Sequence, residues 1–278
     1  MTTAARVARA VAGSPTLWAI LGSRLVRVGD LLRRSRLRAT EEAEAALAAS
    51  PALLERVVQA GPFRGMKYPA ARSFGSTLYP KLVGCYECEL HPWLQLLHGR
   101  AYTRVMDIGC AEGYYAVGLA LLFPDAVVHA HDTDPQALAA CREVAVANGV
   151  HERVRLGGAL STDDLIRFGA GGSGLIVCDC EGCELTLFTA DAAARLADCD
   201  LIVELHDFLN PAISSTLLDR FRRTHVVRTV GTTPRSPDRI PVLRSLPPLA
   251  RELAVAELRP GPMEWMLAES RSGGRAGR

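Results

Sequence analysis

From residue 104 onward, short apolar runs alternate with segments of helical pattern. Five of these runs predict buried strands, at 104–108, 126–131, 153–157, 175–179 and 200–205. Apolar residues recur at helical spacing after each strand, and the predicted helices cover 113–123, 135–148, 162–168, 184–196 and 211–223. Because buried strands that alternate with helices form parallel sheets, the pattern predicts an α/β fold with helices on both faces of the sheet.

Two further apolar runs near the C-terminal end, 224–230 and 264–268, predict two more strands. A proline-rich excursion and a predicted helix at 248–256 separate them. The expected fold is therefore a Rossmann-like, seven-stranded, mostly parallel sheet.

The first 60 residues follow a different pattern, in which Ala, Leu, Val and Arg repeat at helical spacing. Breaks near 13–15 and at 50–51 divide this stretch into two or three predicted helices. Residues 61–82 are rich in turn formers and predict a small hairpin. The segment 87–99 predicts a helix that leads into the sheet.

These patterns divide the chain into three parts. The parts are an N-terminal helical extension or lid at 1–82, a sheet domain at 83–269 and a disordered tail at 270–278. The 278 residues suffice for one α/β domain and an added subdomain, and a hydrophobic content of 49% indicates a well-filled core.

Charge is distributed unevenly along the chain. The net charge is +2, but residues 1–40 hold eight arginines against the single acid Asp30, which gives +7 for that segment. Trp18 is the sole aromatic residue of the first 60, so the stacking platform of an RNA-binding surface is missing. We interpret the segment as a solvated helical lid. A surface for an anionic acceptor, or for nucleic acid or a membrane, stays an alternative.

Neither a spanning segment nor a secretory signal stands out, because arginines interrupt the N-terminal apolar pieces. The eight cysteines lie in apolar strands or in turns, which favours reduced thiols in a cytoplasmic protein. Two Cys-x-x-Cys pairs, Cys85/Cys88 and Cys180/Cys183, could bind zinc. Their separation is unlike that of compact zinc ribbons, so we expect small packed cysteines instead.

A glycine turn follows the first predicted strand, where Asp107 ends the apolar run and the turn covers 109–113. A strand that turns through glycines into a helix exposes backbone N–H groups, and we expect these donors to point at a ligand. The missing Lys-Ser/Thr excludes a phosphate-binding loop. The order strand–Asp–x–Gly–x–x–x–Gly–helix resembles the first motif of class I S-adenosylmethionine-dependent methyltransferases.

The ends of the second and third strands fit the same ligand. Asp132 stands where a carboxylate receives two hydrogen bonds from a ribose diol, whereas Asp134 suits a helix N-cap. The segment 157–160, which includes Ala159, would lie along the edge of the adenine.

The ends of the fourth and fifth strands point to one branch of these enzymes. Asp-Cys-Glu-Gly-Cys-Glu-Leu at 179–185 resembles the fourth motif of FkbM-type methyltransferases, and Glu-Leu-His at 204–206 resembles their fifth strand end. Upstream, Gly-Cys-Tyr-Glu-Cys-Glu-Leu at 84–90 resembles a segment that precedes their domain. The resemblance covers about 80–268. It implies S-adenosylmethionine as cofactor and O-methylation of natural products or sugars.

The resemblance also implies roles for individual residues. The cofactor-binding positions are Tyr86, Glu87, Asp107, Gly109, Ala111, Gly113, Asp132, Thr133, Ala159 and Asp179. Three residues, Glu181, Glu204 and His206, are the candidates for catalysis by removal of the acceptor's proton. An imidazole titrates near neutrality and suits that task, although His206 could equally bond a backbone carbonyl.

A metal is a further alternative at the same strand ends. Asp179, Glu204 and His206 offer hard ligands for a divalent Mg or Mn ion, which would lower the pKa of an acceptor hydroxyl. The ligand pattern of metal-dependent O-methyltransferases is absent, so we favour catalysis without a metal.

We expect a small-molecule acceptor as the partner and do not expect nucleic acid. We expect no membrane-spanning segment, and a homodimer stays an alternative. Two other functions remain. One is an RNA or protein methyltransferase that uses the basic N-terminus, although an Asn/Asp-Pro-Pro-Tyr motif for amine methylation is absent. The other is a non-catalytic protein that binds S-adenosylmethionine.

Overall fold

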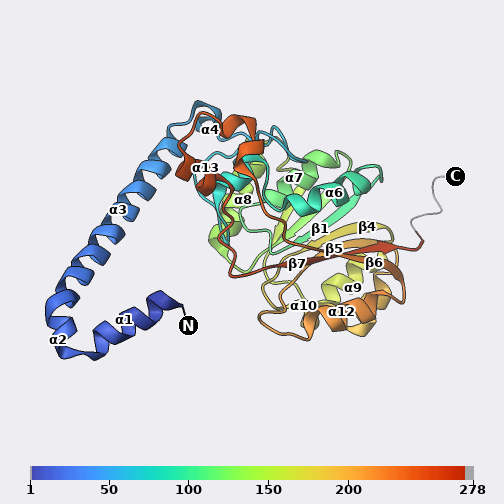
Figure 1. Cartoon of the computed structure of the whole chain (residues 1–278). Helices are drawn as coiled ribbons and strands as arrows, with labels where there is room; N and C mark the ends of the chain where they lie inside the picture. Colours follow the sequence, from blue (N-terminus) through green and yellow to red (C-terminus); the bar gives the residue numbers. More distant parts are fainter. Residues whose placement is uncertain (1, 273–278) are drawn as a thin grey trace.

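The computed structural model describes residues 2–272, and a seven-stranded sheet forms its centre (Figure 1). The strands are β1 Arg104–Ile108, β2 Val127–His131, β3 Val154–Gly157, β4 Gly174–Cys178, β5 Cys199–Leu205, β6 His225–Gly231 and β7 Glu264–Ser270. Their order is β3-β2-β1-β4-β5-β7-β6, in which β1 to β5 are parallel and β7 is antiparallel to both neighbours. The predicted fold class is confirmed.

Helices pack on both faces of the sheet and create two hydrophobic cores. One core holds α6 His91–His98, α7 Tyr114–Leu122, α8 Pro135–Ala147 and α13 Pro248–Val255. The other holds α9 Thr162–Ala170, α10 Glu184–Leu187, α11 Ala190–Arg195 and α12 Ile213–Phe221. The single helix predicted at 184–196 is wrong. Thr189 interrupts it, because its side chain accepts a hydrogen bond from Ala192 N and so begins α11 as an N-cap.

The hairpin predicted within 61–82 is also wrong. An isolated antiparallel bridge joins Val57 to Lys67, and the segment then forms α5 Leu78–Val83. Gly84 ends α5 with a positive φ of 83°, and a Cβ there would lie 2.1 Å from Ala60 O. Gly61 has a φ of 77°, and a Cβ there would lie 2.9 Å from Gly84 O, so glycine at both positions allows two loops to cross closely.

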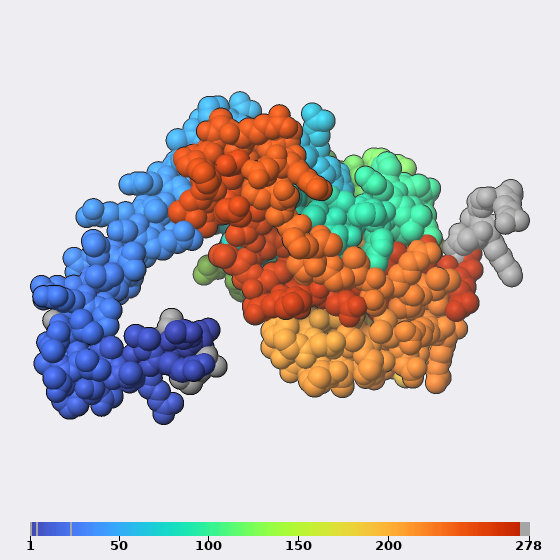
Figure 2. All heavy atoms as spheres, viewed as in Figure 1, coloured from blue at the N-terminus to red at the C-terminus, as the bar shows by residue number. Residues whose placement is uncertain are grey.

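The N-terminal helices form an arm that projects from the sheet domain (Figures 1 and 2). The arm consists of α1 Thr3–Gly13, α2 Pro15–Leu17, the π-helical turn Trp18–Gly22 and α3 Ser23–Ala48, and α4 Pro51–Leu54 follows it. Ser14 caps α2 at the predicted break by accepting a hydrogen bond from Leu17 N. The last turns of α3 pack against α13, where Ala43 and Leu47 are buried.

Short turns and connections complete the description. Two 3-10 turns, Pro237–Arg239 and Pro241–Leu243, and a short 3-10 turn at Cys88–Leu90 lie in the connections. The connection 256–263 between α13 and β7 is called the strap below. The tail predicted to be disordered begins inside β7, and its residues 273–278 lie outside the described part of the chain.

None of the helices within residues 2–272 combines the length and the apolar character that crossing a bilayer requires.

Candidate functional site

The carboxyl ends of the parallel strands surround a cavity of about 560 Å³. Seven of the ten predicted cofactor positions line it, namely Tyr86, Gly109, Ala111, Asp132, Thr133, Ala159 and Asp179. Loops after β1 to β4 thus bring together residues that are far apart in the sequence.

The glycine turn after β1 is held by contacts within the chain. Gly109 has a φ of 80°, and a Cβ there would lie 1.7 Å from Asp179 O, so glycine allows the loops after β1 and β4 to meet. Gly109 N and Cys110 N both donate to His131 O, at 2.8 and 3.0 Å. Ala111 N donates to Asp132 Oδ2 at 2.9 Å. β2 and its loop satisfy the amides of Gly109, Cys110 and Ala111, so at these three positions the expectation that the donors point at a ligand is wrong.

Asp132 links the turn to the next loop while lining the cavity. Its Oδ2 accepts from Ala111 N, and its Oδ1 accepts from Asp134 N at 2.8 Å. Asp134 caps α8, as predicted, by accepting from Gln136 N at 2.8 Å. Each oxygen of Asp132 has a second lone pair, so the carboxylate can still accept two hydroxyl groups.

Two predicted cofactor residues, Asp107 and Gly113, do not line the cavity. Asp107 is buried, and burial raises the pKa of its carboxyl to about 8. Gly113 precedes α7 with a φ of 95°, and a Cβ there would lie 2.7 Å from Cys141 Sγ. They support the turn from behind, because one is part of the core and the other lets α7 approach α8.

Glu112, which no motif singled out, anchors the loop 73–76 at the cavity. Its two oxygens accept from Ser73 Oγ and Phe74 N, both at 2.9 Å, and it forms a buried ion pair with Lys81. Phe74 and Lys81 line the cavity. Since residues 74–81 belong to the predicted extension 1–82 and no cavity-lining residue precedes 74, a lid role for α1 to α3 stays a prediction.

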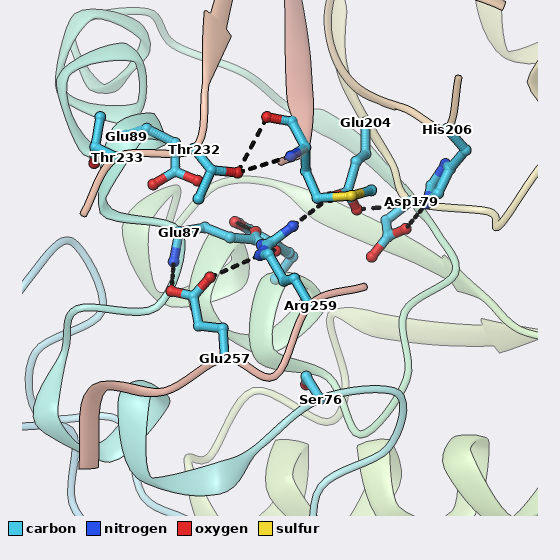
Figure 3. Close-up of polar contacts among 12 residues, drawn as sticks. Ser76, Glu87, Glu89, Asp179, Glu204, His206, Thr232, Thr233, Glu257 and Arg259 are labelled. Carbon is cyan, nitrogen blue, oxygen red and sulfur yellow. Dashed lines mark hydrogen bonds and ion pairs between the residues drawn. The ribbon is translucent and has the colours of Figure 1, made fainter. Parts of the chain in front are cut away.

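A smaller chamber of about 100 Å³ adjoins the large cavity (Figure 3). It is lined by Glu87, Glu204, His206, Glu257, Leu258, Arg259 and other residues. Five residues line both spaces, namely Gly75, Ser76, Tyr86, Asp179 and Glu181. Glu87, predicted beside the cofactor, therefore lines the chamber and not the large cavity.

Backbone strain concentrates at these two spaces. Within residues 2–272, five non-glycine residues have a positive φ, and four of them line the cavity or the chamber: Glu87 (46°), Ala111 (48°), Glu181 (51°) and Leu258 (54°). Such a conformation costs free energy and persists only where the surroundings enforce it, which is typical of functional sites.

His206 lies among four carboxylates. Its Nδ1 bonds Glu184, and its Nε2 lies 3.3 Å from Asp179 Oδ1 and 3.5 Å from Glu181 Oε2. Burial alone would lower the pKa of His206, but the hydrogen bonds to Asp179 and Glu184 outweigh it and raise the pKa to about 10. The imidazole is therefore protonated at neutral pH, and the expectation of a near-neutral base at this position is wrong.

Arg259, which the strap carries into the chamber, was not anticipated. Its guanidinium lies 2.5 Å from Glu204 Oε1, 2.6 Å from Glu87 Oε1 and 2.8 Å from Glu257 Oε2 (Figure 3). One sequence feature could have indicated a nearby cation. Acidic residues are in excess at the strand ends, and buried carboxylates require a cation. Nothing in the local pattern of the strap indicates which arginine supplies it.

The carboxyl groups of the chamber differ in their proton affinity. Burial raises the pKa of Glu87 to about 7 against the lowering effect of Arg259, and burial with the charge of Asp179 raises the pKa of Glu204 to about 10. Burial also opposes ionisation of Asp179, but hydrogen bonds from His206 and Glu204 outweigh it and lower its pKa. The chamber thus holds an ionised Asp179 beside a neutral Glu204 and a Glu87 close to its midpoint at neutral pH.

Within residues 2–272, two groups of side chains could hold a metal ion, each with ligand atoms within 4.8 Å of one another. One comprises Asp179, Glu181 and His206, and the other comprises Glu87, Asp179 and Glu204. The predicted set of Asp179, Glu204 and His206 is divided between them. The donors suit a hard ion, but Arg259 already pairs with two carboxylates of the second group.

A disulfide joins Cys180 to Cys183 at the wall of the large cavity, which corrects the expectation that all cysteines are reduced. The other six cysteines of the chain are free, and burial raises the pKa of Cys85 to about 12. Since Cys180 and Cys183 bond each other, the two Cys-x-x-Cys pairs do not form a four-thiolate zinc site here. A cytoplasmic location stays a prediction.

The chain is similar to known methyltransferases over part of its length. Residues 93–168 match the family model of the methyltransferase small domain. A ribosomal protein L11 methyltransferase from Alkalilimnicola ehrlichii is 38% identical over 86 residues, which are 31% of this chain and 27% of that protein. One from Methylococcus capsulatus is 40% identical over 84 residues, 30% and 26% respectively. The chain thus spans about a quarter of the length of these relatives.

Among solved structures, the precorrin-6y C5,15-methyltransferase from Geobacter metallireducens is 14% identical, with a TM-score of 0.43 over 64% of this chain and 87% of that one. The matched segment 93–168 runs from α6 through α9 and carries the glycine turn and Asp132. In the sheet, β7 and β6 form an antiparallel pair at one edge. Residues 93–168 are therefore similar to the methyltransferase small domain, and the sheet that contains them has the predicted Rossmann-like order.

Proposed function

We propose that this chain transfers a methyl group from S-adenosylmethionine to a hydroxyl of a small-molecule acceptor, as an FkbM-like O-methyltransferase. One observation carries the proposal: the large cavity and the acidic chamber share a wall that contains Asp179 and Glu181. A cofactor in the first space and an acceptor in the second would meet at these carboxylates. Holding two reactants in contact is the main source of rate in such a displacement.

The residues of the large cavity fit the cofactor. Asp132 has lone pairs for a ribose diol, and Ala159 and Leu160 offer an apolar edge for the adenine. The bound cofactor supplies an electrophilic methyl group on a sulfonium. Asp179 is ionised and lines this space, so its negative charge would stabilise that sulfonium.

The chamber contains a group that can take the proton of the acceptor hydroxyl. As the bond from methyl to sulfur breaks and the bond from methyl to acceptor oxygen forms, the hydroxyl proton must leave. Glu87 can take it, because its pKa is about 7 and Arg259 stabilises the ionised form. The protonated His206 and Glu204 instead hold Asp179 in place. Glu181, on the shared wall, is the candidate that orients the acceptor hydroxyl.

The proposal needs no metal. A divalent ion in the chamber would be held by Glu87, Asp179 and Glu204, where it would acidify the hydroxyl. Arg259 already contributes positive charge to the same carboxylates.

Methylation of a protein is the second candidate, and the names of the curated relatives favour it. Their similarity is confined to about 30% of this chain, so it bears on the cofactor more than on the acceptor. The chamber of about 100 Å³ beneath the strap favours a small group over a folded protein surface.

Methyl transfer from tritiated S-adenosylmethionine tests both candidates. The protein is incubated with a cell extract that has been separated into small-molecule, protein and RNA fractions. We expect label in the small-molecule fraction, in a product that resists mild base as an ether does. Label in protein would support the second candidate, and the absence of both label and binding of the demethylated cofactor in calorimetry would refute methyl transfer.

A further inference from the structure

The N-terminal arm carries an apolar stripe that nothing covers within the described part of the chain. Leu25, Val28 and Leu32 follow one another at intervals of three and four residues, which places them on one face of α3, and Trp18 and Leu21 precede them in the π-helical turn. Their exposed fractions lie between 38% and 65%. Figures 1 and 2 show this part of the arm standing clear of the sheet domain.

The same stripe becomes a packing face at the other end of α3. Ala43 and Leu47 continue it, and both are buried where α3 contacts α13. The helix is thus anchored on the domain by its last turns, whereas its first turns present the same face to the surroundings. An exposed apolar stripe on an anchored helix marks an interaction surface.

Positive charge accompanies the stripe. Arg24 and Arg36 lie beside the stripe, whereas Arg27, Arg34 and Arg38 lie on the opposite side of α3. Residues 1–40 hold eight arginines and one acid, a net charge of +7, whereas the whole chain has +2. A partner for this arm must therefore accept apolar side chains and also carry dense negative charge.

Of the possible partners, an anionic bilayer surface meets both requirements. A second copy of the arm would bring one arginine-rich helix against another, and the repulsion opposes that pairing. RNA offers the negative charge, but Trp18 is the sole aromatic residue in the arm for stacking. A basic amphipathic helix with a tryptophan on its apolar side is typical of helices that lie in the membrane interface.

We propose that α1 to α3 bind the surface of an anionic lipid bilayer, with the stripe of Trp18, Leu21, Leu25, Val28 and Leu32 inserted between the headgroups. Arg24 and Arg36 then face anionic headgroups at the edges of the stripe, with their long side chains extended toward them. The helix lies in the plane of the interface and does not cross the bilayer. This inference does not depend on the methyl acceptor.

Sedimentation with vesicles tests it on the full chain. Vesicles of phosphatidylcholine with phosphatidylserine should sediment the protein, and vesicles of phosphatidylcholine alone should not. Raised salt should weaken the binding, because the attraction to headgroups is screened. Trp18 fluorescence should shift to the blue with the anionic vesicles, and a Trp18→Phe variant should lose that shift while Trp93 and Trp265 remain.

Two pairs of variants separate the apolar and the charged contributions. Leu25→Gln with Leu32→Gln should weaken binding to anionic vesicles roughly tenfold or more, because two inserted side chains become polar. The control pair is Leu96→Gln with Val146→Gln, which changes equally exposed apolar residues of α6 and α8 and should have no effect. Arg24→Gln with Arg36→Gln should also weaken binding roughly tenfold or more, whereas Arg222→Gln with Arg223→Gln should not.

Three outcomes would overturn the proposal. The first is no preference for anionic vesicles. The second is a dimer in sedimentation velocity that the Leu25/Leu32 variant abolishes, with no vesicle binding by the wild type. The third is retention of RNA by the arm in the absence of vesicle binding. Circular dichroism of each variant establishes that the chain is folded, so that a loss of binding can be assigned to the arm.

Discussion

The large cavity and the acidic chamber share a wall but are assembled in different ways. Loops directly after β1 to β4 supply most of the lining of the cavity. The chamber takes Glu87 from before β1, Glu204 and His206 from β5 and its end, and Arg259 from the strap before β7. The large cavity therefore forms mainly at the ends of consecutive strands, whereas the chamber depends on segments from both ends of the domain.

Their electrostatics differ as well. In the cavity, polar groups are satisfied mostly by nearby backbone, as Asp132 is by Ala111 N and Asp134 N. In the chamber, buried charges satisfy one another, and proton positions depend on the whole group. The comparison predicts that a single substitution in the cavity will affect only its neighbouring contacts. A single substitution in the chamber will affect the whole group of charges.

The largest effect is expected at the shared wall. Asp179→Asn should lower kcat by roughly a thousandfold, because the chamber loses its ionised carboxylate beside both reactants. Binding of the demethylated cofactor, measured by calorimetry, should weaken far less. Asp191→Asn, an exposed acid on α11, is the control and should leave kcat unchanged. An equal loss in affinity for the demethylated cofactor and in kcat would show that Asp179 acts only on the cofactor in the large cavity.

Arg259→Met should destabilise the fold by about 3 kcal/mol, since it leaves the buried Glu87 without its cation. Urea unfolding measures the change. Arg251→Met is the matched control, because Arg251 pairs with an exposed Asp238 and should shift the free energy of unfolding by less than about 1 kcal/mol. Equal effects of the two variants would contradict a collective network in the chamber.

Asp132→Asn should weaken binding of the demethylated cofactor roughly tenfold to a hundredfold, because hydrogen bonds to a charged acceptor are lost. Asp134→Asn keeps an N-cap on α8 and serves as the control, with affinity changed less than roughly threefold. Titration calorimetry measures both variants. If the variants behave alike, Asp132 acts only as a structural link between two loops.

Stability should fall as pH rises above neutrality. The pKa of His206 is raised from 6.5 to about 10 by folding, so the native state binds the extra proton between these values. Its contribution to stability is complete below pH 6.5 and is lost as pH rises toward 10, by about 1–2 kcal/mol between neutrality and mildly alkaline pH. Urea unfolding across this range should show the decline in wild type and a flatter profile in His206→Gln. A flat wild-type profile would contradict the protonated imidazole.

The smallest effect is expected from chelation. Since Arg259 supplies the cation beside Glu87 and Glu204, methyl transfer should be unchanged by a chelator or by added Mg²⁺. Initial rates measure this. A loss of activity with chelator that Mg²⁺ restores would assign the chamber to a metal.

The comparison also explains which features the sequence revealed. The strands and most helices follow from apolar periodicity, and seven of ten cofactor positions line the cavity because strand ends converge in any parallel α/β sheet. The exceptions have local causes. Gly113 resembles a ligand-binding glycine but is required by Cys141 of α8, a contact between helices that no local pattern contains.

The chamber was less accessible to sequence analysis for a physical reason. His206 was identified by its place after a strand, but its pKa depends on Glu184 and Asp179, which folding places around it. Arg259 belongs to the irregular strap, and periodicity carries no information on where a loop crosses a sheet edge. Long-range charge pairing therefore determines this site, and it becomes visible only once the chain is folded.

The strap has a consequence for how such an enzyme diversifies. It contributes Glu257, Leu258 and Arg259 to the chamber and nothing to the lining of the large cavity. Substitutions in the strap can alter the size and charge of the group that the chamber admits, while the lining of the large cavity stays as it is. Selection on a new acceptor can thus act on an irregular loop, the part of a fold that tolerates insertion and replacement most readily.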